Sequence, residues 1–280
     1  MITPLLATAT SALFGCADFL GGFASKRDSA VSVTATSHML GLVILAAASA
    51  AIGATGGVWP DIGWGALAGV SGGIGVVALY AALARGRMSV VAPMTAALAG
   101  AIPATIDVAR GTPLGPTTGI GVVLALVAII VVTAAPSADD GVVTKPSAVP
   151  LALVAGVGFA GSFLALANTT LASGLWPLVG ARVVSVTLLA ALATARSGTP
   201  FVTPEARRAT LMAGVFDSCA SITMLTAIRI GPLAVAAVLG SLYPIVVVLL
   251  ARFVLGERLR WLQRAGVAGA LVAVALTAVP

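Results

Sequence analysis

Apolar stretches of about 20 residues fill almost the whole chain, and each is long enough to cross the hydrocarbon core of a bilayer as an α-helix. Hydrophobic residues make up 59% of the 280 residues and charged residues only 9%, whereas a soluble domain carries about 25% charged residues. The N-terminus lacks the basic segment of a cleaved signal peptide, so we expect the first helix to be retained. The sequence therefore predicts an all-α, multi-pass protein of the cell membrane.

Short connections rich in glycine, proline and charged residues divide the chain into ten predicted transmembrane helices. A longer polar stretch, residues 136–147, is predicted to be a flexible linker between a first unit of five helices (3–135) and a second unit of five (148–279). The predicted helices cover residues 3–24, 31–53, 62–84, 88–109, 115–135, 148–169, 176–196, 207–228, 232–254 and 261–279.

The two units are related to each other in sequence. At one constant offset, Gly86, Gly111 and Gly121 correspond to Gly231, Gly256 and Gly266, and both stretches have the same helix–turn–helix pattern. Because each unit has an odd number of helices, the second must enter the membrane in the opposite sense to the first. The sequence therefore predicts an inverted-topology repeat, an architecture that many secondary transporters use to alternate access to a site near the midplane.

Cations are concentrated in the odd-numbered connections, whereas the even-numbered ones contain little beyond Arg110 and Arg229. By the positive-inside rule, the odd connections face the cytoplasm and both termini lie outside. The same distribution accounts for the net charge of +6 without nucleic-acid binding. The cations of the odd connections are Lys26, Arg27, Arg85, Arg87, Lys145, Arg196, Arg207, Arg208, Arg258, Arg260 and Arg264.

One segment, GPLAVAAVLGSLYPIVVVLLARFVLGERLRWLQRAGV, resembles the closing helices of an EamA-type repeat of the drug/metabolite transporter superfamily. The resemblance rests on Pro244 within the fourth helix and on the Gly256-Glu257-Arg258 turn. It extends over the chain as two repeats, although Thr112 and Pro113 replace Glu-Arg in the first. It implies a ten-helix carrier that exports small metabolites such as amino acids or drugs. Members are commonly drawn with cytoplasmic termini; the charge distribution indicates the opposite orientation, which we adopt.

Two ionisable residues lie inside the first two predicted helices, where charge is costly and usually functional. Asp18 and His38 are each about 12 Å from the turn that joins their helices, so they lie at matching depth near the midplane. We expect them to meet and to carry a proton against the substrate. The GCADFLGG segment around Asp18 also resembles the first helix of small multidrug-resistance transporters, in which a lone acid binds protons and cations. Alternatively, local hydroxyl groups satisfy both side chains.

The second half contains one buried pair of opposite charges, Arg182 and Asp217. They are predicted to pair and to line the substrate site, since arginine suits a carboxylate or phosphate; a purely structural ion pair is the alternative. Further candidates for the cavity wall are Tyr80, Tyr243 and Asn168, whereas Trp176 is expected at the membrane interface. Breaks in the helical backbone, with a possible role in gating, are predicted at Pro93, Pro103 and Pro244.

A secondary active transporter, most naturally an exporter, accounts for the repeat and for the sparse buried charges. A membrane channel or a scaffold subunit without active transport is the alternative. An enzyme is disfavoured by the single histidine and the missing HExxH motif, and direct ATP use by the missing phosphate-binding loop. We expect no disulfide between Cys16 and Cys219, no cofactor and no metal. The expected partners are a small-molecule substrate, the lipid bilayer and protons; a homodimer is left open.

Overall fold

A computed structural model describes residues 2–86, 88–134, 145–255 and 261–278. Within these ranges the chain is helical and contains no strand. The predicted Gly256-Glu257-Arg258 turn and most of the predicted linker lie outside the described residues. The helices are α1 (Ile2–Ala24), α2 (Ala30–Ile52), α3 (Val58–Arg85), α4 (Met88–Ala109), α5 (Pro116–Ala134), α6 (Ala148–Leu166), the 3₁₀ turn η1 (Leu171–Ser173), α7 (Trp176–Ser197), α8 (Pro204–Ile230), α9 (Leu233–Gly240), α10 (Tyr243–Leu255) and α11 (Trp261–Ala278).

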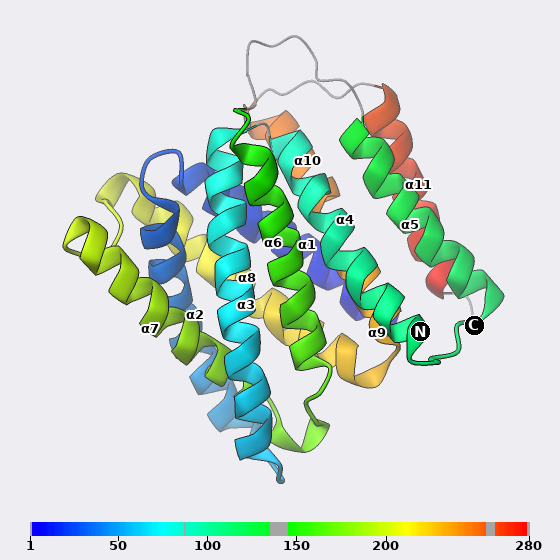
Figure 1. Cartoon of the computed structure of the whole chain (residues 1–280), viewed down its shortest axis with the longest axis horizontal. Helices are drawn as coiled ribbons and strands as arrows, with labels where there is room; N and C mark the ends of the chain where they lie inside the picture. Colours follow the sequence, from blue (N-terminus) through cyan, green and yellow to red (C-terminus); the bar gives the residue numbers. More distant parts are fainter. Residues whose placement is uncertain (1, 87, 135–144, 256–260, 279–280) are drawn as a thin grey trace.

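The described helices follow the predicted ranges closely, and most ends agree within four residues. Among the described residues, eight segments are long and apolar enough to cross a membrane, with α9 and α10 together forming one of them. Two further apolar helices, α5 and α11, pack against each other at one edge of the bundle (Figure 1). Large apolar side chains such as Leu5, Val43 and Phe253 are 66–77% exposed on the outer surface, as expected for a protein surrounded by lipid.

The ninth predicted helix, 232–254, is interrupted close to Pro244, where a backbone break was predicted, and the structure divides it into α9 and α10. The break falls at Ser241 and Leu242. Pro244 explains its position, since proline has no N–H to donate to the carbonyl of Gly240 four residues earlier. The other two prolines behave differently: Pro93 and Pro103 both lie inside the continuous helix α4.

The two halves of the chain are interleaved rather than side by side. Helix α1 packs against α8, α3 packs against α6 and α7, and α2 packs mainly against α7 and α8. The described parts of α1 and α11 bring both ends of the chain to the same end of the bundle (Figure 1). Side chains from both halves therefore meet in the centre.

Small residues allow α3 and α7 to approach closely. A Cβ atom at Gly65 would lie 2.0 Å from the carbonyl oxygen of Pro177, and one at Gly69 would lie 2.2 Å from that of Ala181. A Cβ atom at Gly73, one turn further along, would lie 3.2 Å from Ser185 Cβ. Their spacing of four residues puts all three on one face of α3, and the structure confirms this face as a helix-packing surface. The packing fixes the position of α7, which carries Arg182.

Candidate functional site

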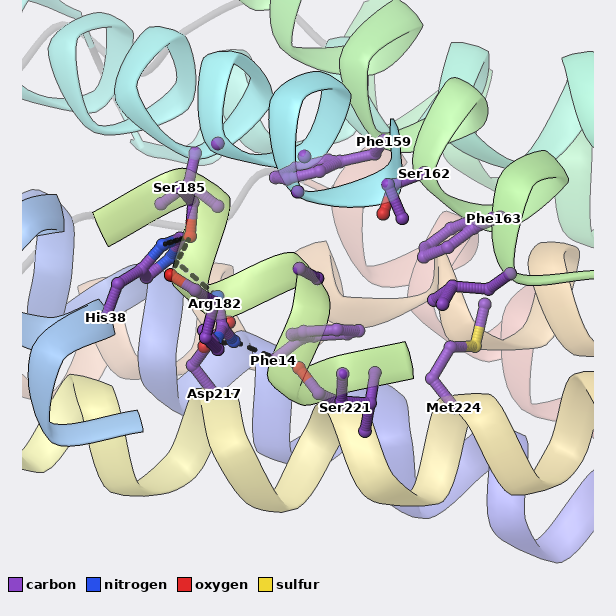
Figure 2. Close-up of a pocket in the computed structure, with 18 of the residues that line it drawn as sticks. Phe14, His38, Phe159, Ser162, Phe163, Arg182, Ser185, Asp217, Ser221 and Met224 are labelled. Carbon is purple, nitrogen blue, oxygen red and sulfur yellow. Dashed lines mark hydrogen bonds and ion pairs between the residues drawn. The ribbon is translucent and has the colours of Figure 1, made fainter. Parts of the chain in front are cut away.

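A cavity of about 80 Å³ lies in the middle of the bundle between the two halves of the chain (Figure 2). Its wall comes from α1, α2, α3, α6, α7, α8 and the start of α10. Polar side chains gather on one side, and aromatic rings from α1 and α6 form much of the rest. The residues that matter most for its chemistry are Asp18, His38, Arg182, Ser185, Asp217 and Ser221, together with Phe14, Phe159 and Phe163.

Arg182 of α7 and Asp217 of α8 form an ion pair, which confirms the predicted pairing (Figure 2). Each side chain is only 10% exposed, and the same Nη2 atom of Arg182 donates a second hydrogen bond to Ser221 Oγ at 3.1 Å. Gly41 of α2 leaves room for the guanidinium group, because a Cβ atom there would lie 3.3 Å from Arg182 Nε. Helices α2, α7 and α8 therefore together form the space that the ion pair occupies.

The hydrogen bonds of His38 fix the form of its ring. Arginine can only donate, so His38 Nε2 must accept the bond from Arg182 Nη1 at 2.9 Å. The proton of the neutral imidazole is then on Nδ1, which donates to Ser185 Oγ at 2.9 Å. The Ser185 hydroxyl in turn donates to the carbonyl oxygen of Arg182 at 3.3 Å. The ring of His38 is therefore neutral, and hydrogen bonds connect it to the side chains of Arg182 and Ser185.

Asp18 of α1 also lines the cavity and is 5% exposed. Among the described residues, none donates a hydrogen bond to its carboxyl group. The expected meeting of Asp18 and His38 is realised only in part: both side chains face the same cavity, but the contacts of His38 are with Arg182 and Ser185.

The charges around the cavity do not balance when both carboxyl groups are ionised. Arg182 neutralises Asp217, and the neutral ring of His38 adds no positive charge. Asp18 is then left with an uncompensated negative charge in a medium where an isolated charge is costly. A proton or a cation bound at Asp18 would remove this cost.

The remaining predicted site residues occupy different places. Tyr243, at the start of α10, lines the cavity. Tyr80 does not belong to the cavity wall, because its buried ring packs where a Cβ atom of Gly21 would be and its hydroxyl is 3.5 Å from the carbonyl oxygen of Ala17. Asn168 lies just beyond the end of α6, exposed, and donates to the carbonyl oxygen of Leu164. Trp176 begins α7 and is half-buried.

Two polar residues of the site were missed from the sequence. Ser185 follows Arg182 by three residues, and Ser221 follows Asp217 by four, so each shares a helix face with the charged residue. This spacing was visible in the sequence, although serine is common enough in transmembrane helices that it did not stand out. The aromatic residues Phe14, Phe159 and Phe163 carried no comparable signal.

Comparison with known proteins gives three findings. Residues 146–279 match the model of the EamA-like transporter family. No curated protein sequence matches the chain. A solved structure described only as "Crystal structure of protein" is similar over 96% of this chain and 96% of its own, with a TM-score of 0.68 and 20% sequence identity. At that identity the similarity establishes a shared fold over nearly the full length and nothing further.

Proposed function

We propose, from the match of residues 146–279 to the EamA-like transporter family, that the chain is a secondary active transporter that exports a small metabolite in exchange for protons. The family match suggests a membrane transporter of the drug/metabolite type. The proton coupling, the direction and the site are our proposals. The observation that carries them is the buried network of Arg182, His38 and Asp217 beside the unpaired carboxyl group of Asp18.

We propose that the substrate binds where Asp217 now contacts Arg182. A carboxylate or phosphate group can take the place of Asp217 at the guanidinium, because arginine binds both groups in the same geometry; Asp217 would then take up a proton to keep the charge balanced. The aromatic rings of Phe14, Phe159 and Phe163 would hold the apolar part of the substrate. Asp18 would bind the proton in the alternate step of the cycle.

The size of the cavity supports an alternating-access cycle. Pockets for small metabolites typically measure about 300–1,000 Å³, whereas this one has about 80 Å³, which is room for a few water molecules. In this interpretation the structure is an occluded state, and substrate enters only after the helices that carry Asp18, Arg182 and Asp217 move apart at one end.

We propose ten membrane spans arranged as two inverted repeats. The packing supports this, because contacts recur when the halves are exchanged: α3 packs on α6 as α1 packs on α8, and α4 packs on α6 as α1 packs on α9 and α10. Gly86 and Gly231, equivalent in sequence, both follow their helices in extended backbone conformations.

A matching pair of contacts at opposite ends of the bundle adds support. The carboxylate of Asp61, in the first turn of α3, accepts a hydrogen bond at 2.7 Å from the N–H of Thr170, between α6 and α7. The carboxylate of Asp28, between α1 and α2, accepts one at 2.7 Å from the N–H of Thr203, which precedes α8. Each contact joins the first hairpin of one half to the start of the third helix of the other.

The test is transport by the purified protein in proteoliposomes. We expect a panel of carboxylated and phosphorylated metabolites to include one whose flux depends on the protein and is driven by a pH gradient. Arg182→Ala should abolish this flux, whereas Arg110→Ala, at an exposed position at the end of α4, should preserve it. A flux that never exceeds equilibration under any gradient would instead support a channel.

A further inference from the structure

A second cavity, of about 540 Å³, opens on the outer surface of the bundle between α1, α8 and α10. It shares no lining residue with the central cavity, because it uses another face of α1. Asp18 and Phe14 face the centre, whereas Phe19 and Phe23 line this outer groove. The groove opens to the exterior, with its lining residues Met212 and Val254 exposed by 43% and 59%.

The groove is charged at one end and apolar along the rest of its length. Arg27, Arg208 and Glu205 lie at the charged end, beside the start of α8, while Phe216 and Leu250 lie deeper. Arg208 and Phe216 are eight residues apart on one helix, a rise of about 12 Å. One leaflet of the hydrocarbon core is about 15 Å deep, so the groove extends from the headgroup level to near the midplane.

The two arginines are suited to a phosphate group. The Arg27 guanidinium lies 4.4 Å above the centre of the Phe23 ring and donates to the backbone carbonyl of Glu205 at 3.3 Å. These contacts hold it at the mouth of the groove and leave other N–H groups available. With Arg208 the mouth carries two positive charges against the single negative charge of Glu205, so its net charge is complementary to a phosphate.

We propose that this groove binds one phospholipid molecule, with its phosphate on Arg27 and Arg208 and an acyl chain along Phe19, Met212 and Phe216. The groove lies on helices that span the membrane, and its two chemical zones match the headgroup and the tail of a lipid in one leaflet. This inference rests on the groove, its charges and the membrane location, and it does not depend on what the protein transports.

The experiment uses the full chain in nanodiscs that contain phosphatidylglycerol with a photoactivatable diazirine in one acyl chain. After irradiation, mass spectrometry measures the cross-linking of the α1 peptide around Phe19 and the α8 peptide around Phe216. Arg208→Gln and Arg27→Gln should each reduce cross-linking about fivefold, the contribution of one arginine to lipid phosphate binding. The control is Arg207→Gln, because Arg207 lines a separate surface groove with Leu211 and should not affect these peptides.

A competition in the wild-type protein gives a second, independent result. Excess unlabelled phosphatidylglycerol should displace the probe, whereas diacylglycerol with the same chains, which has no phosphate, should not. The proposal is overturned if diacylglycerol competes equally well, or if Arg207→Gln and Arg208→Gln have the same effect. Either result would mean that bulk lipid tails cover the groove without recognition of a headgroup.

Discussion

At the scale of single residues, the site depends on a buried ion pair whose two members were predictable and whose neighbours were not. In the described part of the second half, Arg182 and Asp217 are the only buried pair of opposite charges, and an unpaired charge in hydrocarbon is too costly to persist. The partner of His38 could not be predicted, because depth in the membrane says nothing about the direction in which a side chain points. Helix α2 packs mainly against α7 and α8 and only slightly against α1, so His38 contacts Arg182.

The first prediction concerns the stability of this pair. Asp217→Ala should lower the free energy of unfolding by about 3–5 kcal/mol, because it leaves the buried charge of Arg182 without a partner. The double variant Arg182→Met/Asp217→Ala should be more stable than Asp217→Ala alone, because it no longer contains the unpaired charge. Thermal unfolding in detergent, with Ser221→Ala as a milder control of about 1 kcal/mol, checks both statements. Equal stability of the single and double variants would show that the pair is not energetically coupled.

The second prediction concerns His38. In His38→Gln the amide oxygen can accept the bond from Arg182 and the amide nitrogen can donate to Ser185, so the network survives without a titratable ring. Protonation of His38 would place a second positive charge against Arg182 and remove the acceptor. We therefore expect wild-type transport to fall more steeply on acidification than that of His38→Gln. In His38→Leu the acceptor is lost at every pH, and transport should be low throughout; identical pH profiles of wild type and His38→Gln would contradict this role.

At the scale of the elements, hydropathy and turn-forming residues located the helices well, because each transmembrane helix must satisfy its own backbone hydrogen bonds. Which of the predicted proline breaks would interrupt a helix was harder to predict. Three prolines lie inside predicted helices, but only Pro244 interrupts one, whereas α4 continues through Pro93 and Pro103. Neighbouring helices decide which break is tolerated, and the sequence of one helix does not contain that information.

The third prediction tests the close contact of α3 with α7. Gly69→Ala should destabilise the protein by about 1–3 kcal/mol, because its new methyl group would overlap the carbonyl oxygen of Ala181. Gly63→Ala, six residues earlier on the same helix, has open space around it and should be neutral or slightly stabilising. Comparison of their melting temperatures and of their transport rates separates crowding from the general effect of a new side chain. A destabilisation of both variants to the same extent would count against the contact.

At the scale of the whole molecule, the duplicated pattern of glycines indicated two related units but not how they are combined. The sequence alone would also have allowed two separate bundles of five helices. Interleaving arises because α2 and α3 each bury small-residue faces against the other half, for example Ser37 of α2 against Gly214 of α8 and Gly75 of α3 against Gly158 of α6. A central cavity shared by both halves is the consequence, and it explains why residues far apart in sequence form one site.

The fourth prediction is the orientation in the membrane. In a variant without Cys16 and Cys219, a cysteine introduced at Thr55, between α2 and α3, should react with a membrane-impermeant thiol reagent in intact cells. A cysteine at Thr199, between α7 and α8, should react only after permeabilisation, because the positive-inside rule predicts that the cations of that connection face the cytoplasm. Both positions are exposed. If only the cysteine at position 199 is labelled in intact cells, the protein has the opposite orientation to the predicted one.

The central claim is that proton binding at Asp18 drives transport through a site shared by the two halves. The most direct measurement compares wild type and Asp18→Asn in proteoliposomes in two assays: accumulation driven by a pH gradient, and exchange of labelled for unlabelled substrate without a gradient. We expect Asp18→Asn to abolish accumulation while exchange continues at a similar rate. Asparagine keeps the shape of the aspartate side chain but cannot bind and release a proton. Full gradient-driven accumulation by Asp18→Asn would contradict the claim and would reduce Asp18 to a packing residue.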